Sequence, residues 1–180
     1  MSILRQIDGS VLWLLDAGEV ATANLRREAA AEGIDPTRLV FAGRVPQGEH
    51  LGRLRLADLC LDTLPCNAHT TANDALFVGV PILTRPGRAF AARVCASLAT
   101  AAGMPELIVA DRAEYVARAV QLGRERSQLA ALRAKLELNR TTTSLFDVPG
   151  FTRAIEAGYF AMHQRYRDGL QPAHIAVDSL

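Results

Sequence analysis

The chain has 180 residues, of which 49% are hydrophobic and 22% charged, and its formal net charge is +1. This length suits a single domain that can bury a substantial core. The balanced charge argues against a nucleic-acid-binding platform or a polybasic membrane surface, and the aromatic content of 6% argues against a surface that stacks bases.

The three cysteines, Cys60, Cys66 and Cys95, form no CxxC pair and are odd in number. We expect Cys60 and Cys95 to be buried free thiols, because each lies in an apolar stretch. Cys66 lies near His69, but a Cys–His nucleophilic pair is the less favoured interpretation. No apolar run reaches the roughly 18 residues that span a bilayer, and no signal-peptide pattern opens the chain. The sequence therefore predicts a cytoplasmic protein that does not associate with membranes.

Short apolar strands alternate with helical segments along the chain. In chain order, the pattern predicts a strand at 11–16, a helix at 21–33, a strand at 39–43, a helix at 48–57, a strand at 60–62, a helix at 70–79, a strand at 81–84, a helix at 89–103 and a strand at 107–110. Two or three helices follow, with a loop expected at 139–150. This βαβ series predicts an α/β fold with a doubly wound, mostly parallel, Rossmann-like sheet and helices on both faces.

The stretch from Leu56 to Gly79 carries the strongest functional signal. It predicts a buried strand, a tight loop, and a helix whose first turn carries His69, Thr70 and Thr71. A helix start presents unpaired N–H groups and a partial positive charge, and ligands of open α/β sheets bind at the carboxyl ends of strands. The pattern therefore indicates a site for a phosphate or diphosphate. The alternative is that a threonine is an ordinary N-cap and His69 a loop residue.

Two carboxylates lie close to this motif. Asp74 is one turn into the helix and shares a face with the threonines, so it can accept hydrogen bonds from ribose hydroxyls or simply favour the positive helix start. We expect Asp62, at the strand end, to order the loop through backbone N–H groups rather than to act in catalysis. His163 and His174 have no partners at metal-ligand spacing, and no HExxH, GxGxxG, P-loop or GxSxG pattern occurs. No metal, dinucleotide cofactor or serine hydrolase site is therefore indicated.

The segments CLDTLPCNAHTTANDAL, GVPILTRPG and AARVCASL resemble the C-terminal part of the catalytic domain of O-linked N-acetylglucosamine transferases, the SPINDLY-type family of protein glycosyltransferases. The similarity runs from Ser10 to Ile175. It implies the C-terminal lobe of a GT-B type glycosyltransferase, which moves N-acetylglucosamine from UDP-GlcNAc to Ser or Thr hydroxyls of acceptor proteins. It also implies one nucleotide-sugar-binding lobe over residues 1–180, with a βα core at 1–138 and a C-terminal loop and helix at 139–180.

The resemblance assigns residues to the donor UDP-GlcNAc. His50 and Arg53, which are three residues apart on one helix face, correspond to residues that stack on uracil and read its edge, together with the backbone of Val45. Without the resemblance, the sequence would indicate that His50 and Arg53 are ordinary charged residues on a solvated helix. Gln47 stands where relatives have a lysine directed at the ribose. The remaining donor-binding positions are those of the helix start: His69, Thr70, Thr71 and Asp74.

The resemblance further implies parts that would lie upstream of Met1. These are the first strand of the nucleotide lobe, a lysine that contacts the diphosphate, the N-terminal lobe, and tetratricopeptide repeats. We expect the groups that act on the acceptor to come from that lobe, so that this chain holds no catalytic residue. We also expect no cofactor and no metal. Because the lysine and the opposite wall of the diphosphate site are missing, we expect this chain to bind UDP weakly on its own. Two alternatives remain: a non-catalytic nucleotide- or protein-binding module derived from this fold, and a two-lobed transferase that uses another nucleotide sugar.

Overall fold

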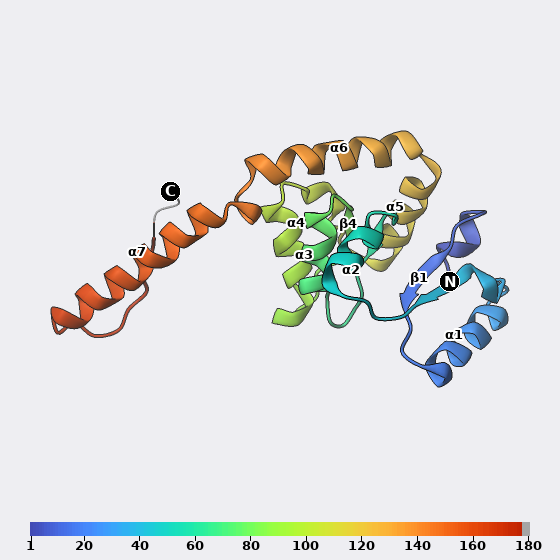
Figure 1. Ribbon diagram of the computed structural model, residues 1–180, viewed down its shortest axis with the longest axis horizontal. Coiled ribbons are helices and arrows are strands. Elements are labelled where there is room, and N and C mark those ends of the chain that lie inside the picture. Colours follow the sequence, from blue (N-terminus) through green and yellow to red (C-terminus); the bar gives the residue numbers. More distant parts are fainter. Residues whose placement is uncertain (178–180) are drawn as a thin grey trace.

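The computed structural model describes residues 1–177 and confirms the alternation of strands and helices (Figure 1). The strands are β1 (Leu12–Leu15), β2 (Leu39–Ala42), β3 (Cys60–Leu61) and β4 (Ile82–Leu83). The helices are α1 (Glu19–Ala31), α2 (Gln47–Leu54), α3 (Thr70–Phe77), α4 (Val94–Ala101), α5 (Arg112–Arg124), α6 (Arg126–Thr142) and α7 (Val148–Arg167). Short 3-10 turns connect them: η1 (Leu4–Gln6), η2 (Pro36–Arg38), η3 (Phe90–Ala92), η4 (Pro105–Leu107) and η5 (Ser144–Phe146).

The first sheet region comprises η1, β1, α1, η2 and β2, residues 4–42. Its two strands run parallel, from the pair Leu12–Leu39 to the pair Leu15–Ala42. Helix α1 ends before Gly33, whose φ of +72° is a conformation that glycine adopts without strain. The returning chain then packs Ile34 beside Leu39, so that this region has a small core of its own.

The second sheet region comprises β3, β4 and helices α3 to α6, residues 60–142. Strands β3 and β4 are parallel and pair Cys60 with Ile82 and Leu61 with Leu83. Both β4 residues are fully buried, as is expected where helices surround a parallel pair. The carboxyl ends of these strands carry Asp62 and Thr84, where a ligand of such a sheet would bind.

Two predicted elements are shorter than expected. The strand at 107–110 is reduced to a single bridge between Thr84 and Ile108, because η4 precedes it and Asp111 caps α5 immediately after it. The helix expected at 89–103 begins only at Val94. The carbonyl of Ala92 accepts the backbone N–H of Gly87 at 2.7 Å, which folds residues 87–92 into a separate turn.

The loop expected at 139–150 is wrong over much of its length. Helix α6 continues to Thr142, η5 follows at once, and α7 begins at Val148 with the Asp147 carboxylate accepting the N–H of Gly150. Helix α7 extends away from the rest of the chain and contains no buried residue (Figure 1). Of the C-terminal part predicted at 139–180, residues 178–180 lie outside the described range.

Helix α2 lies between the two sheet regions. Its apolar side chains Leu51 and Leu54 pack against a buried cluster that includes Ala75 and Val78 of α3 and its C-cap. On its other side, the Arg53 guanidinium carbon lies 5.6 Å from the centre of the Trp13 ring. This helix therefore connects β1 of the first sheet region with α3 of the second.

Candidate functional site

Asp62 organises the loop between β3 and α3. Its carboxylate Oδ1 accepts the backbone N–H of Thr63 at 2.8 Å and of Ala68 at 2.6 Å, while Oδ2 accepts the hydroxyl of Thr84 at 2.6 Å. The residue is only 9% exposed. A buried carboxylate with three donors is well satisfied. The structure thus confirms the prediction that Asp62 orders the loop.

The same loop is tied to the turn after β4. The Asn67 N–H donates to the carbonyl of Ala91 at 2.8 Å, and its side-chain amide donates to the carbonyl of Thr63 at 3.0 Å. The amide oxygen of Asn67 is buried and has no protein partner among the described residues. Since the loop is held at both ends and in its middle, the residues that follow it, His69 to Thr71, start from a fixed position.

Helix α3 begins at Thr70, after the N-cap residue His69. No side chain caps it, so neither threonine acts as the ordinary N-cap of the alternative interpretation. Thr70 and Thr71 are exposed, and their hydroxyls make no hydrogen bond within the described residues. The first N–H groups of the helix and two hydroxyls are therefore open to a ligand. Asp74, half-buried, lies one turn further along the same helix.

The His69 ring is held against η3. Its Nε2 lies 3.3 Å from the carbonyl oxygen of Ala91, and the ring meets Phe90 edge-on with centroids 6.4 Å apart. A hydrogen bond to a carbonyl requires the proton on Nε2, which leaves Nδ1 as the free nitrogen. Nδ1 can then donate to a phosphate only in the doubly protonated imidazolium, whereas the neutral ring offers an acceptor there.

The predicted base-binding residues lie on and just before α2. Val45 is in the exposed loop after β2, Gln47 is the exposed first residue of the helix, and His50 is half-buried one turn later. Arg53 is already engaged, since its Nη1 donates to the carbonyl of Gly43 at 2.9 Å and its guanidinium covers Trp13. Its Nε is buried without a partner in the described part of the chain. Helix α2 packs on α3 through Leu51 and Leu54, which contact the cluster of Ala75 and Val78 toward the C-terminal end of α3.

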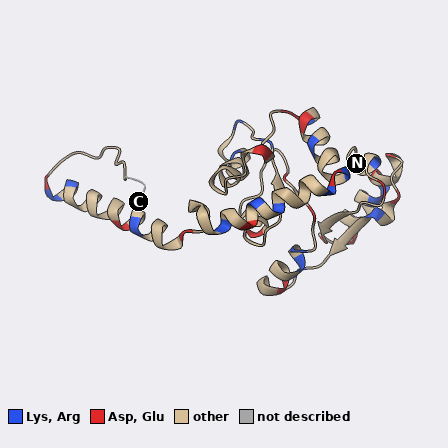
Figure 2. Cartoon of the chain, turned by 90° about the horizontal axis from the view of Figure 1, so that it is seen from above, with Lys and Arg blue, Asp and Glu red and all other residues tan. Residues whose placement is uncertain are grey.

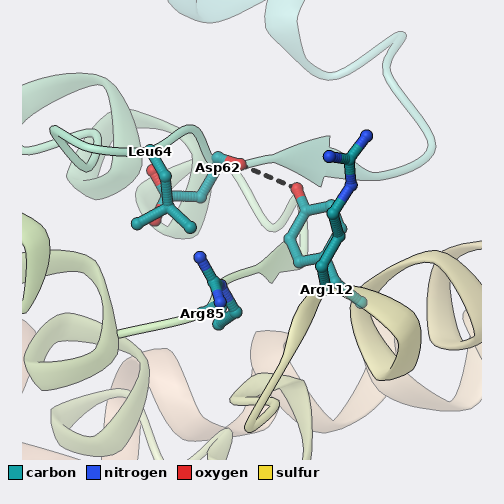
Figure 3. Close-up of a pocket in the computed structure, with 5 residues that line it drawn as sticks. Asp62, Leu64, Arg85 and Arg112 are labelled. Carbon is teal, nitrogen blue, oxygen red and sulfur yellow. Dashed lines mark hydrogen bonds between the residues drawn. The ribbon is translucent and has the colours of Figure 1, made fainter. Parts of the chain in front are cut away.

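A cavity that the sequence analysis missed opens at the carboxyl ends of β3 and β4 (Figure 3). It measures about 280 Å³ and is lined by Asp62, Leu64, Arg85, Arg112 and Tyr115. The phenol of Tyr115 donates to the backbone carbonyl of Asp62 at 2.8 Å. Burial, followed by the negative charge of Asp62, raises the pKa of this phenol, so it remains a protonated donor at neutral pH. The available signal was position: Arg85 follows a strand just as Asp62 does.

The three cysteines differ in environment. Cys95 is fully buried, which confirms its prediction, whereas Cys60 is half-buried and Cys66 is exposed in the loop before His69. Burial, with a smaller contribution from the charge of Asp62, raises the pKa of Cys60 to about 11 and that of Cys95 to about 12. These two thiols are therefore protonated at neutral pH and poor nucleophiles.

Charged residues are spread over the ribbon with no extended area of one sign, as Figure 2 shows. Among residues 1–177, no group of three His, Cys, Asp or Glu side chains is placed to hold a metal ion. Within the same range, no helix combines the length and the apolar character needed to cross a membrane.

Comparison with known proteins relates this geometry to a family. Residues 1–155 match the model of glycosyl transferase family 41. The chain is 40% identical over 175 residues to a UDP-N-acetylglucosamine–peptide N-acetylglucosaminyltransferase of Caenorhabditis elegans, covering 97% of the chain and 15% of that protein. It is 38% identical over 177 residues to the probable transferase SEC of Arabidopsis thaliana, covering 98% of the chain and 18% of that protein.

A solved structure matches as well. The O-GlcNAc transferase of Thermobaculum terrenum, in its K341M mutant, superposes with a TM-score of 0.77 at 33% identity, covering 84% of this chain and 30% of that one. This likeness confirms the predicted class, a mostly parallel, Rossmann-like α/β lobe of GT-B type. The chain spans less than a fifth of the length of the two curated relatives named above.

Proposed function

Because the chain belongs to glycosyl transferase family 41, we propose that it is the UDP-sugar-binding lobe of a protein O-GlcNAc transferase. In this proposal it holds UDP-GlcNAc while the sugar passes to a Ser or Thr hydroxyl of an acceptor protein. The observation that carries the proposal is the start of α3, where Thr70 and Thr71 present free hydroxyls at the carboxyl end of β3.

The role of this helix start is to stabilise the leaving group. Departure of UDP leaves negative charge on the diphosphate, and donors that are already fixed around it stabilise that charge without reorganising. Thr70 and Thr71 supply hydroxyls, the helix supplies N–H groups and a partial positive charge, and Asp62 keeps the preceding loop in place. The proposal includes no metal and no other cofactor, because the groups that it assigns to the diphosphate are hydroxyls, N–H groups and the partial positive charge of the helix start.

The uridine would lie along α2. His50 would stack on the base, and Asp74 would accept from the ribose hydroxyls, as the family resemblance implies. Arg53 would read the uracil edge with donors other than the Nη1 hydrogen that Gly43 already accepts. Gln47, exposed at the start of α2, would offer the ribose an amide instead of a charge, which favours a lower affinity than a lysine would give.

In the whole protein, we propose that residues 1–180 form one nucleotide-sugar-binding lobe, with the βα core at 1–138 and the C-terminal part at 139–180. An N-terminal lobe and tetratricopeptide repeats would supply the acceptor-binding groups and the remaining donor contacts. Two observations support this arrangement: the relatives are named as peptide N-acetylglucosaminyltransferases, and the chain spans 15% and 18% of their length. The three free thiols suit a reducing cytoplasm as its location.

The test of the proposal is to remove both hydroxyls at the helix start. In the full-length enzyme, the double variant Thr70→Ala/Thr71→Ala loses two hydrogen bonds to a charged group, each worth about 1.5–3 kcal/mol. Its kcat/KM for transfer should fall about a hundredfold or more. The matched control is Thr141→Ala/Thr142→Ala, two exposed threonines near the end of α6 whose hydroxyls bond only to Leu138.

A second measurement separates base binding from phosphate binding. His50→Ala removes stacking worth about 1–3 kcal/mol by analogy with nucleic-acid sites, so it should mainly raise KM for the donor. The purified chain alone should bind UDP weakly and transfer no sugar. Wild-type turnover by the folded double threonine variant would overturn the phosphate assignment. A sub-micromolar dissociation constant of the chain for UDP would show that its donor site is complete.

A further inference from the structure

The cavity at the ends of β3 and β4 is built from distant parts of the sequence. Asp62 and Leu64 belong to the loop after β3, Arg85 follows β4, and Arg112 is the first residue of α5. Figure 3 shows Arg85 reaching from the end of β4 toward Leu64, while Arg112 lies on the opposite side of the cavity. Arg85 and Arg112 thus both line one small, open space.

Arg85 is half-buried and has no polar partner in the described part of the chain. It makes no side-chain hydrogen bond or ion pair within residues 1–177, and neither does Arg112. Partial removal of a charged group from water is unfavourable unless it gains a partner. Arg112 is exposed and loses little hydration, so it stands at the rim. Arg85 is partly desolvated, and an anionic ligand would compensate for the hydration that it loses.

The neighbouring carboxylates are occupied elsewhere. Asp62 directs its two oxygens to Thr63, Ala68 and Thr84. At the start of α5, the Asp111 carboxylate accepts the N–H of Glu114 at 2.9 Å, and the Glu114 carboxylate accepts the N–H of Ala110 at 2.7 Å.

None of these acids pairs with Arg85 or Arg112. The cavity therefore keeps two cationic side chains that no described acidic residue pairs with, although the charge of Asp62 lies close to them.

Asp62 contacts both the residue that leads into α3 and the wall of this cavity. Its carboxylate holds Ala68, which leads into that helix, while its backbone carbonyl accepts the phenol of Tyr115 in the cavity wall. The side chains of His69, Thr70 and Thr71 do not line the cavity. The residues that line the cavity and the residues of the helix start are therefore different sets, and Asp62 contacts both.

We propose that this cavity is a second anion site, distinct from the donor site, in which Arg85 binds a small oxyanion and Arg112 closes over it from the rim. The site goes beyond the donor-binding function and does not depend on it. A planar guanidinium fork matches the oxygens of a phosphate or a carboxylate. Such a group comes either from a free phosphate ion or from an acidic side chain of a bound polypeptide.

The test is titration of the purified chain with inorganic phosphate, followed by NMR of the arginine Nε–H signals. We expect saturable shifts at Arg85 and Arg112. Arg85→Gln should weaken phosphate binding at least about tenfold, because it removes a charged donor pair, and Arg112→Gln should weaken it less. Arg88→Gln is the matched control, since Arg88 is exposed in the same loop but does not line the cavity.

Titration with UDP distinguishes the two anion positions. Thr70→Ala/Thr71→Ala should weaken UDP binding and leave the phosphate shifts at Arg85 unchanged, while Arg85→Gln should do the reverse. If Arg85→Gln does not fold, Arg85→Lys keeps the charge but loses the fork, and it should still weaken phosphate binding. If UDP displaces phosphate from Arg85, the cavity belongs to the donor site and the proposal fails. It also fails if phosphate causes no saturable shift at Arg85.

The source of the oxyanion is decided by a pair of short peptides, one with a phosphoserine and the other with serine at that position. Tighter binding of the phosphopeptide than of free phosphate, lost in Arg85→Gln, would assign the site to a polypeptide side chain. Binding of free phosphate alone would assign it to the ion. Equal binding of the two peptides, unaffected by Arg85→Gln, would show that Arg85 recognises no oxyanion on a polypeptide and would overturn that assignment.

Discussion

The first sheet region buries four apolar residues around one another, Leu4, Ala29, Ile34 and Leu39, whereas the main cluster of the second sheet region buries thirteen. The start of α3 and the cavity beside Arg85 both belong to the larger region. A diphosphate needs donors that stay in place as its charge develops, and a large core provides a rigid support for them. Helix α2, which would hold the base, instead depends on packing from both regions.

Each region also contains a polar side chain that holds several groups of a connecting segment, Arg38 in the first and Asp62 in the second. In the first, the Arg38 guanidinium donates to the carbonyls of Leu4, Ile7 and Ser10 at 2.7–2.8 Å. In the second, Asp62 accepts from two backbone N–H groups and one hydroxyl. Arg38 is half-buried and fixes the N-terminal segment, while Asp62 is buried and fixes a ligand-binding loop.

The largest difference should appear when a leucine is truncated in each core. Leu136→Ala should lower the free energy of unfolding by about 3–5 kcal/mol, because the side chain is fully buried in the large cluster and leaves a cavity. Leu39→Ala should cost about 2–3 kcal/mol, since its smaller, partly exposed surroundings can close in. Urea unfolding measures both, with the 64% exposed Leu138→Ala as control. An equal cost at both sites would contradict the difference in rigidity.

Removing Asp62 should lower the stability more than removing Arg38, because Asp62 is buried and Arg38 is half-buried. Asp62→Ala leaves buried donors without a partner and should cost about 2–5 kcal/mol. Arg38→Ala should cost about 1–3 kcal/mol, because water can reach the carbonyls that it leaves. The matched controls are the exposed residues Asp58→Ala and Arg27→Ala. Thermal unfolding would count against this account if Arg38→Ala were the more damaging change.

Alkaline pH should weaken the second region through its thiols. In the folded chain, burial raises the pKa of Cys60 to about 11 and that of Cys95 to about 12, against 9.0 for a thiol in water. The unfolded chain therefore loses these protons first, so stability is complete below about pH 9 and falls as the pH rises toward 12. Cys95→Ala should flatten this dependence, whereas Cys66→Ala should leave it unchanged. A slope that persists in a Cys60→Ala/Cys95→Ala double variant would assign it to other groups.

The smallest loss of stability should follow from weakening the contact of helix α2 with the first sheet region. Arg53→Gln removes the bond to Gly43 and the contact with Trp13, which together should lower the stability by about 1 kcal/mol. Its control is Arg55→Gln, at the exposed C-cap of α2. Hydrogen exchange should rise in α2 and β1 but not in α3. Faster exchange in α3 alone would show that α2 is supported by the second region only.

The predictions that the structure confirms rest on local properties. The alternation of apolar strands and helices placed β1 to β4 and α1 to α3, and the position of Asp62 directly after a strand indicated that it orders the following loop. The elements that were predicted wrongly lie where nearby residues claim backbone groups or positions that the predicted element would need. Ala92 gives its carbonyl to Gly87 instead of a helix, and Asp111 begins α5 before a full strand can form at 107–110.

The donor-site assignments from the resemblance stay predictions. The cavity lined by Arg85 and Arg112 was not predicted from the sequence. His69, Thr70, Thr71 and Asp74 are adjacent in the chain, so one helix start was enough to group them. Arg85 and Arg112 are brought together only by the parallel arrangement of β3, β4 and the residues before α5.

The sequence by itself determined the order of the elements, the buried faces and the helix start at Thr70, because these depend on residues within a few positions of one another. Only the tertiary structure decided the register of the strands, the contact of Arg53 with Trp13 and the lack of a partner for Arg85 within residues 1–177. These features depend on which distant groups meet when the core closes. Side-chain packing sets that outcome, and no local pattern in the chain specifies it.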